Sequence, residues 1–166
     1  MGLDMYLTKK TYIGAEYEHR EVAGKIDLTI KGQPVNINFN RVQSIVEKVG
    51  YWRKANQIHN WFVQNVQDGE DDCREYRVSR ENFESLLADI NTVLNAKDTP
   101  EEEGAIEDLL PPTSGCFFGS TEIDEWYWTD LEDTKHLIGN ILTEMDEDEK
   151  RQNAWIGIDY YYSASW

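Results

Sequence analysis

The chain has 166 residues and a formal net charge of −16, a length that predicts one domain able to bury a core without a metal or disulfide staple. Six Trp and nine Tyr make it too aromatic for a disordered protein. The charge argues against a uniformly basic nucleic-acid-binding protein. No apolar run reaches the roughly 18 residues of a membrane span, and Met1–Met5 does not begin a secretory signal.

The charge is distributed unevenly along the chain. Residues 1–66 carry nine Lys and Arg against six Asp and Glu, a net charge of +3, whereas residues 67–166 carry seven against twenty-six, a net charge of −19. This asymmetry suggests either two functional faces or pairing between the halves. The two cysteines, Cys73 and Cys116, lack CxxC spacing and are expected to be free thiols in a reducing cytoplasm.

The first third of the chain has the alternation of β-strands. A strand is predicted over residues 5–13, followed by a loop over residues 15–24. Apolar and polar residues alternate within residues 25–30 and within residues 35–39, on either side of the turn residues 31–34. This pattern predicts a hairpin with one buried face and one wet face. Residues 41–49 fit a strand or a helix.

Helical periodicity dominates from Tyr51 onward. Apolar residues predict a helix over residues 51–66, and a short strand is expected within residues 73–78. Ser79 is predicted to cap the next helix, which extends through Leu94. Capping boxes are predicted at Thr99–Glu102, with Pro100 at the first helical position, and at Thr129–Glu132, and Pro111 is expected to end the third helix. Residues 155–162 predict a buried strand.

This order of elements predicts an α+β fold in which several helices pack on a mainly antiparallel sheet, with residues 1–166 forming a single domain. Homo-oligomerisation is possible because the excess of Trp and Tyr suits an interface, although it suits an aromatic core equally well.

The segment Tyr51–Val63 is the first candidate for a ligand site. On the predicted helix, Trp52, Asn56 and His59 share one flank, Arg53 lies further round, and Lys54 lies on the other flank of the apolar stripe. Trp52 would stack on a base, Asn56 and His59 would read polar edges, and Arg53 and Lys54 would meet phosphate. Alternatively, Trp52 and His59 cover the sheet and Arg53 pairs with a carboxylate.

The glycine-containing loop that precedes the last helix is the second candidate. Its backbone N–H groups and hydroxyls would close around an anion, although it lacks the spacing of a P-loop. Alternatively, its aromatic rings close the core. The ligand-binding candidates in this loop are Gly115, Phe117, Phe118, Gly119, Ser120 and Thr121.

Two other kinds of chemistry have less support. Cys73, His59 and Asp71 or Asp72 are the residue types of a thiol enzyme, but the acidic neighbours of Cys73 disfavour its thiolate. The scattered His residues and the acidic runs have no metal-ligand spacing, so neither a metal nor another cofactor is expected. The acidic tracts Glu101–Asp108, Glu122–Asp133 and Glu144–Glu149 would suit a DNA mimic that binds a basic protein, or would simply add solubility.

Five segments of the sequence are distinctive: MGLDMYL (1–7), YWRKAN-x-IH-x-WFV (51–63), VQ-x-G-x-DDC-x-EY-x-VSRE (66–81), LLPP-x-SG-x-FFGST-x-x-DEWYW (109–128) and the aromatic end (160–166). Through these segments the chain resembles an uncharacterised family of small phage and prophage proteins. The similarity extends over nearly the whole sequence, and Cys116 departs from the aromatic residue expected at that position.

The resemblance implies a phage origin and a location in the host cytoplasm, and it supplies no catalytic residues. By analogy with small phage proteins that counter host defence, we expect the chain to bind and sequester an anionic small molecule, such as a nucleotide or cyclic nucleotide. A DNA-mimic inhibitor of a basic host protein is the second hypothesis, and an enzyme acting on a nucleotide is the third. Direct binding to nucleic acid or to a membrane is not expected.

Overall fold

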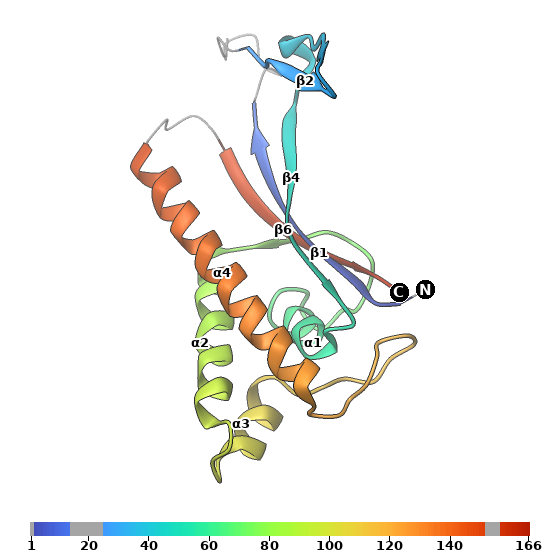
Figure 1. Ribbon diagram of the computed structural model, residues 1–166, viewed down its shortest axis with the longest axis vertical. Coiled ribbons are helices and arrows are strands. Elements are labelled where there is room, and N and C mark those ends of the chain that lie inside the picture. Colours follow the sequence, from blue (N-terminus) through green and yellow to red (C-terminus); the bar gives the residue numbers. More distant parts are fainter. Residues whose placement is uncertain (1, 14–24, 152–156) are drawn as a thin grey trace.

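The computed structural model describes residues 2–13, 25–151 and 157–166, and over these residues the predicted α+β fold is confirmed (Figure 1). A four-stranded antiparallel sheet has the order β4 (Ser44–Arg53), β1 (Asp4–Tyr12), β6 (Gly157–Ser165) and β5 (Tyr76–Val78). The first and last strands of the sequence, β1 and β6, pair over their full lengths in its centre. The predicted loop at residues 15–24 lies outside the described residues, as do the first residues of the predicted strand 155–162.

Strand β1 shows why the helices pack against one face of this sheet. Leu3, Met5 and Leu7 are fully buried at alternate positions, as a strand with one covered face requires. Lys9 continues the same alternation inward, and its ammonium group lies 2.5 Å from Glu144 Oε1 and 2.9 Å from Asp148 Oδ2. Burial opposes the charged form, but hydrogen bonds to the two carboxylates outweigh it and raise the pKa of Lys9.

Four helices cover that face. They are α1 (Asn56–Asn65), α2 (Arg80–Ala96), α3 (Glu102–Leu109) and α4 (Glu125–Arg151). Helices α2 and α4 lie side by side, and the shorter α3 lies at the far end of α2 (Figure 1). Their apolar stripes join the inward residues of β1 and β6 in one core, in which the Tyr162 ring stacks on Phe62 at 4.0 Å between ring centroids.

The helix predicted over residues 51–66 is wrong in its first turn. Strand β4 continues to Arg53, and α1 begins only at Asn56. Tyr51 belongs to the strand, so its agreement with the helical stripe of Ile58, Phe62 and Val66 is accidental. Pairing with β1 decides the structure, since Tyr6 lies opposite Tyr51 and Leu7 opposite Gly50. Strand formation also resolves the ambiguous segment 41–49 from residue 44 onward.

The cap predictions have mixed outcomes. Ser79 caps α2, and Asn82 completes its capping box. At α3 the helix begins at Glu102, and Thr99 Oγ1 accepts a hydrogen bond from the Glu101 N–H at 3.3 Å without forming the predicted box. The box predicted at Thr129 is also wrong, because α4 begins four residues earlier, at Glu125. As predicted, α3 ends at Leu109, before Pro111.

The start of α4 is capped by Asp124. Its Oδ1 accepts hydrogen bonds from the N–H groups of Trp126 and Tyr127 at 2.9 and 3.1 Å. Thr129 lies inside the helix, where its hydroxyl donates to the Glu125 carbonyl.

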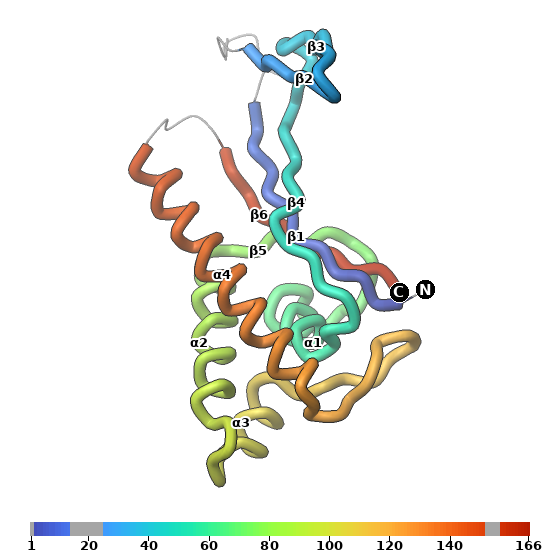
Figure 2. The backbone as a smooth tube through the Cα atoms, in the orientation of Figure 1, coloured from blue at the N-terminus to red at the C-terminus, as the bar shows by residue number. Residues whose placement is uncertain are grey.

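The predicted hairpin forms, but its strands are shorter than expected. Strands β2 (Leu28–Ile30) and β3 (Gln33–Val35) pair at the end of the molecule farthest from α3 (Figure 2). Lys31 and Gly32 make the turn with φ angles of 49° and 78°, the left-handed region that favours glycine. None of the six strand residues is buried, so the predicted buried face of the hairpin has no cover in the described part of the chain.

Candidate functional site

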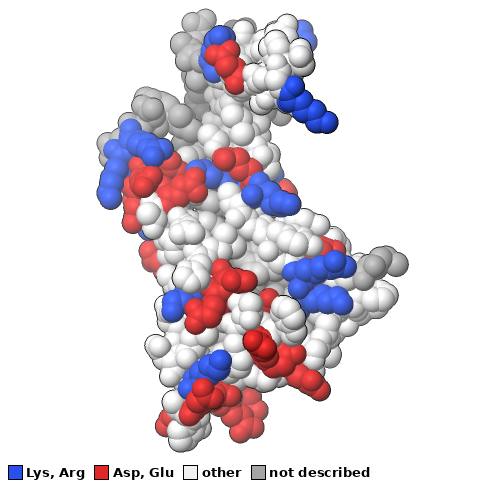
Figure 3. Space-filling model, viewed as in Figure 1, with Lys and Arg blue, Asp and Glu red and all other residues white. Residues whose placement is uncertain are grey.

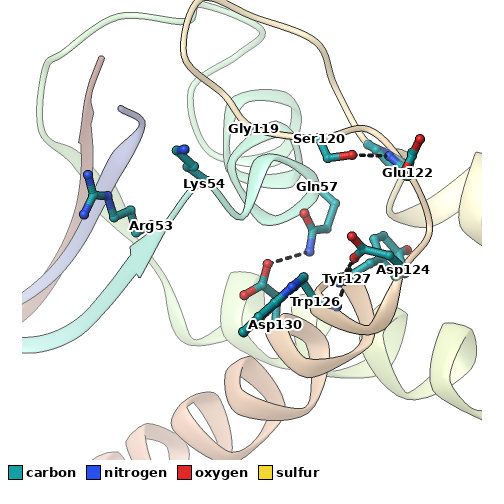
Figure 4. A pocket seen from close by; sticks show the side chains of 11 residues that line it. Arg53, Lys54, Gln57, Gly119, Ser120, Glu122, Asp124, Trp126, Tyr127 and Asp130 are labelled. Atoms are coloured by element: carbon teal, nitrogen blue, oxygen red, sulfur yellow. Dashed lines mark hydrogen bonds between the residues drawn. The ribbon is translucent and has the colours of Figure 1, made fainter. Parts of the chain in front are cut away.

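A pocket of about 280 Å³ lies where the end of β4, the start of α1 and the start of α4 meet the glycine-containing loop (Figure 4). It therefore brings together the two sequence segments that were singled out as candidates. The residues lining it are Arg53, Lys54, Gln57, Pro112, Gly119, Ser120, Glu122, Asp124, Trp126, Tyr127 and Asp130.

Two cations form one side of this pocket. Arg53 is the last residue of β4, and 61% of its side chain is exposed, with Asp4 Oδ1 at 3.9 Å from its Nε. Lys54 follows with φ of 63° and is held by the hydrogen bond from its N–H to the Leu3 carbonyl at 2.9 Å. The strand end thus fixes the backbone of both residues while their charged groups stay available to an anion.

The glycine-containing loop packs closely against this strand end. A Cβ added to Gly119 would lie 3.1 Å from the Cβ of Lys54, and the φ of Gly119 is 98°. Any larger residue would therefore strain the backbone and push the loop from Lys54. Gly115 has a different role, because a Cβ there would lie 2.5 Å from the Phe118 ring that closes the core.

Asn56 joins the two segments. Its side-chain N–H groups donate to the carbonyl of Phe118 at 3.3 Å and to that of Ser120 at 2.8 Å, and its Oδ1 accepts from the Thr113 N–H at 2.9 Å. Asn56 is buried, so it shapes the pocket from behind and does not present its amide to a ligand. The predicted role of Asn56 in reading a polar edge is corrected accordingly.

Carboxylates and an aromatic ring form the other side. In Figure 4, Glu122, Asp124 and Asp130 lie apart from Arg53 and Lys54, whose charged ends extend away from these carboxylates. Trp126 is 75% exposed, which leaves its indole face open to stacking. The pocket is therefore divided into a cationic side and an acidic, aromatic side.

Asp130 is the most perturbed acid of the pocket. Burial raises the pKa of its carboxyl to about 6, the carboxylates of Asp133 and Asp124 add to this, and a hydrogen bond from Gln57 opposes it. Gln57 is itself buried, and its Nε2 donates to Asp130 Oδ2 at 3.3 Å. Asp130 thus titrates close to neutral pH at the back of the pocket.

Trp52 does not lie in the site. It is only 6% exposed, and its indole N–H donates to Thr134 Oγ1 at 2.9 Å in the core between β4 and α4. The predicted stacking role of Trp52 is corrected, because the residue belongs to a strand whose inward face it occupies. The alternative interpretation, in which Trp52 covers the sheet, describes the structure.

His59 is also a core residue and not a ligand-binding one. Its Nδ1 lies 2.7 Å from the Tyr162 hydroxyl, and its Nε2 lies 3.0 Å from Asp71 Oδ1. Burial lowers the pKa of His59, and the Asp71 carboxylate opposes this only in part. A neutral ring satisfies both contacts when Nε2–H donates to Asp71 and Nδ1 accepts from Tyr162, whose own pKa is raised mainly by burial.

The remaining predicted loop residues have different positions. Gly119 and Ser120 line the pocket, whereas Gly115 and Phe118 shape the loop behind it. Phe118 is buried against His59 and Trp166, with ring centroids 5.1 and 5.9 Å away. Phe117 is exposed and outside the pocket, and Thr121 lines a separate groove beside α3.

Seven residues of the pocket lining were missed by the sequence reasoning: Gln57, Pro112, Glu122, Asp124, Trp126, Tyr127 and Asp130. Trp126 lies in the segment DEWYW, where a cluster of aromatic residues directly after an acidic loop was the available signal. Because the α4 cap was predicted at Thr129, that segment was placed outside the helix. Asp130 was noted only as part of the predicted box Thr129–Glu132 and of the acidic tract Glu122–Asp133.

Other possible sites have little structural support. Among the described residues, no group of three or more His, Cys, Asp and Glu side chains is arranged to hold a metal ion. Cys73 and Cys116 are free and exposed, and neither lines the pocket. Within the same residues, no helix combines the length and apolar character needed to cross a membrane.

Comparison with known proteins adds no relative, since no protein family, curated protein or solved structure matches this chain.

Proposed function

We propose that this protein binds a nucleotide-like anionic small molecule in the pocket between Arg53 and Asp130. The observation that carries the proposal is the division of the pocket into a cationic side and an acidic, aromatic side. A simple anion would gain from Arg53 and Lys54 but would be repelled by the carboxylates across the pocket. A ligand with an anionic end and a donor-rich aromatic end satisfies both sides.

Each part of such a ligand has a partner in the pocket. Arg53 has the planar fork that binds phosphate oxygens through two N–H groups, and Lys54 adds a mobile point charge. The exposed indole of Trp126 would stack on the base. Ring or amino N–H groups, or ribose hydroxyls, would donate to Asp130 and Glu122, in place of the roles first expected for Trp52, Asn56 and His59.

The biological setting of the proposal rests on the resemblance to small phage and prophage proteins. In that setting, a binding protein in the host cytoplasm would sequester a nucleotide signal of host defence and would not need to turn it over. Among the described residues, no Cys or His lines the pocket, so its lining holds neither a cysteine nucleophile nor a histidine base. The enzyme hypothesis retains one supporting observation, because a carboxyl with a pKa of about 6 suits general acid–base catalysis.

The hypothesis of a DNA mimic has less support than the pocket, because of the ion pairs that one acidic tract forms. The carboxylates of the tract Glu144–Glu149 largely face cations of the same chain: Glu144 and Asp148 bind Lys9, and Asp146 and Glu149 bind Arg80. Paired carboxylates present less negative charge to a basic partner. Salt-sensitive capture of a basic protein that does not respond to Arg53→Ala would favour this hypothesis over the pocket.

The first test is mass spectrometry of small molecules released when the protein is denatured after incubation with nucleotide extracts from phage-infected and uninfected cells. Sequestration predicts one intact nucleotide per chain, whereas an enzyme would release a converted product. Arg53→Ala/Lys54→Ala and Trp126→Ala should each lower recovery at least tenfold, while Trp126→Phe retains part of it. Lys48→Ala removes an exposed cation of β4 outside the pocket and is the matched control. Recovery of no nucleotide from either extract would refute the proposal.

A further inference from the structure

The β2–β3 hairpin carries an apolar surface that the rest of the described chain does not cover. Its alternating sequence is typical of a strand pair with one buried face, yet Leu28, Ile30 and Val35 are 39%, 54% and 38% exposed. The hairpin lies at one end of the long axis of the molecule (Figure 2). An amphipathic hairpin that is left uncovered by the described residues 2–13, 25–151 and 157–166 is a candidate for contact with another molecule.

Residues 25–43, which contain the hairpin, have a net positive charge in a strongly acidic protein, whereas residues 14–24 before them have a net negative charge. Residues 25–43 carry Lys25, Lys31 and Arg41 against a single carboxylate, Asp27. Lys25 pairs with Asp27 at 2.6 Å, and within the described part of the chain neither Lys31 nor Arg41 has an ion-pair partner. The turn places Lys31 directly after the exposed Ile30. The tip therefore presents one branched apolar side chain beside an available cation.

A groove of complementary character lies beside α3. It has a volume of about 330 Å³ and combines apolar residues with a row of glutamates. Ile106 is buried at its base, and the glutamates lie on successive turns of α3. The residues lining it are Glu102, Glu103, Ile106, Glu107, Pro112, Thr121 and Ile123, with no cation among them.

The hairpin and the groove lie at opposite ends of the molecule. Figure 1 shows β2 at one end of the long axis and α3 at the other. Figure 3 shows Lys and Arg atoms together with Asp and Glu atoms at the hairpin end, and mainly Asp and Glu atoms at the α3 end. The hairpin therefore lies too far from the groove of its own chain to fill it, and a contact between the two surfaces joins different copies.

We propose that the β2–β3 hairpin of one copy docks into the α3 groove of a second copy, with Ile30 against Ile106 and Ile123 and with Lys31 against Glu103 and Glu107. A second copy is the favoured partner because both complementary surfaces, apolar centre and opposite charge, are present on one chain. Two antiparallel copies that exchange hairpins satisfy both contacts in a closed two-fold dimer, whereas one contact per pair of copies builds rings or open chains.

Charge reversal and sedimentation velocity test this contact. At low salt the wild-type mass should rise with protein concentration, and added salt should reduce the association. Lys31→Glu/Arg41→Glu and Glu103→Lys/Glu107→Lys should each weaken association at least tenfold, with unchanged circular dichroism. Ile30→Asp should do the same, because Ile30 supports no core. Lys48→Glu is the matched control and should associate like the wild type.

Mixing the two charge-reversed proteins gives the decisive result. One then carries an acidic hairpin and an acidic groove, and the other a basic hairpin and a basic groove. Each repels itself, whereas the mixture restores a complementary contact, so association should recover towards that of the wild type. A wild type that stays monomeric at low salt over the whole concentration range, a mixture that does not associate, or a closed dimer insensitive to the α3 reversal would overturn the proposal. None of these results bears on the nucleotide pocket.

Discussion

The side-chain amide of Asn56 donates a hydrogen bond to the carbonyl of Ser120 over 2.8 Å and so ties the start of α1 to the loop that forms the pocket. Two further hydrogen bonds, to the Phe118 carbonyl and from the Thr113 N–H, surround the same buried amide. The pocket therefore depends on a residue that no ligand in it would touch.

Asn56→Ala should remove all three hydrogen bonds and leave buried backbone groups without partners. We expect a loss of about 2–3 kcal/mol in the free energy of unfolding, measured by urea denaturation. Asn40→Ala, at an exposed position, is the control and should change it by less than about 0.5 kcal/mol. Equal stability of both variants would mean that Asn56 does not hold the loop.

Trp52 is buried and Trp126 is exposed, so their substitutions to Ala form a matched pair of tests. Trp52→Ala removes a buried ring and its hydrogen bond to Thr134, and we expect a loss of about 3–5 kcal/mol in the free energy of unfolding. Trp126→Ala truncates an exposed ring and should change stability by about 0.5 kcal/mol or less. Urea denaturation of the two variants checks both values, and a large effect at Trp126 would contradict its assignment as an available stacking surface.

The sequence predicts an element of this fold well when the interactions that decide it join residues that are close in the sequence. The Ser79 cap and the stripe of α2 are decided within a few residues, and both are confirmed. The boundary between β4 and α1 is decided by pairing with β1, some 45 residues away, and local periodicity misplaces it. An apolar stripe that includes one residue of a strand can match the period of a helix by chance.

Prediction of the candidate site from the sequence is limited in the same way. The proximity of the segments around Lys54 and Gly119 is a fact of tertiary packing, and the sequence only marks each segment as unusual. Arg53, Lys54, Gly119 and Ser120 line the pocket that joins the two segments. The choice of Trp52 over Trp126 fails because a tryptophan in a strand and one on an exposed helix end look alike without knowledge of burial.

Asp130→Asn should raise stability at pH 8. The pKa of Asp130 is raised to about 6 in the folded protein, so its ionisation opposes folding above that pH. We expect a gain of about 1–2 kcal/mol, a value reduced from the full pKa shift because the residue is partly exposed. The gain should shrink as the pH falls from about 7 to 4, because the Asp130 carboxyl of the folded wild type then becomes protonated and its charge no longer opposes folding. Chemical denaturation at several pH values measures it, and a gain that is independent of pH would rule out ionisation of Asp130 as its cause.

His59 should make the free energy of unfolding change with pH in the opposite direction. Its pKa is lowered by burial, so its contribution to stability is complete above the unfolded pKa of about 6.5 and is lost as the pH falls. His59→Gln should cost about 1–3 kcal/mol at pH 8 and reduce the acid dependence. The exposed His136→Gln is the control. Since Asp130 and His59 act in the same pH range, Asp130→Asn alone should show a steeper acid loss than the wild type.

Lys9 and Lys10 are neighbours on opposite faces of β1 and provide a further test. Lys9→Met leaves Glu144 and Asp148 of α4 without their buried partner, and we expect a loss of about 2–3 kcal/mol in the free energy of unfolding. Lys10→Met removes an ion pair to the more exposed Glu75 and should cost less than about 1 kcal/mol. Thermal or urea denaturation compares them, and equal losses would show that burial of the Lys9 pair contributes nothing.

The central position of β6 has a consequence for the order of folding. Strand β1 leaves the ribosome before the other strands of its sheet, yet one of its two partners, β6, is made only after residue 156. Until then β4 alone can pair with β1, and β5 has no neighbour in the sheet. Pairs so distant in sequence carry a large loop-closure entropy and form slowly. The nascent chain therefore has to hold an incomplete sheet until its final strand arrives, and a ribosome stalled before residue 157 would present an open edge of β1 to other proteins.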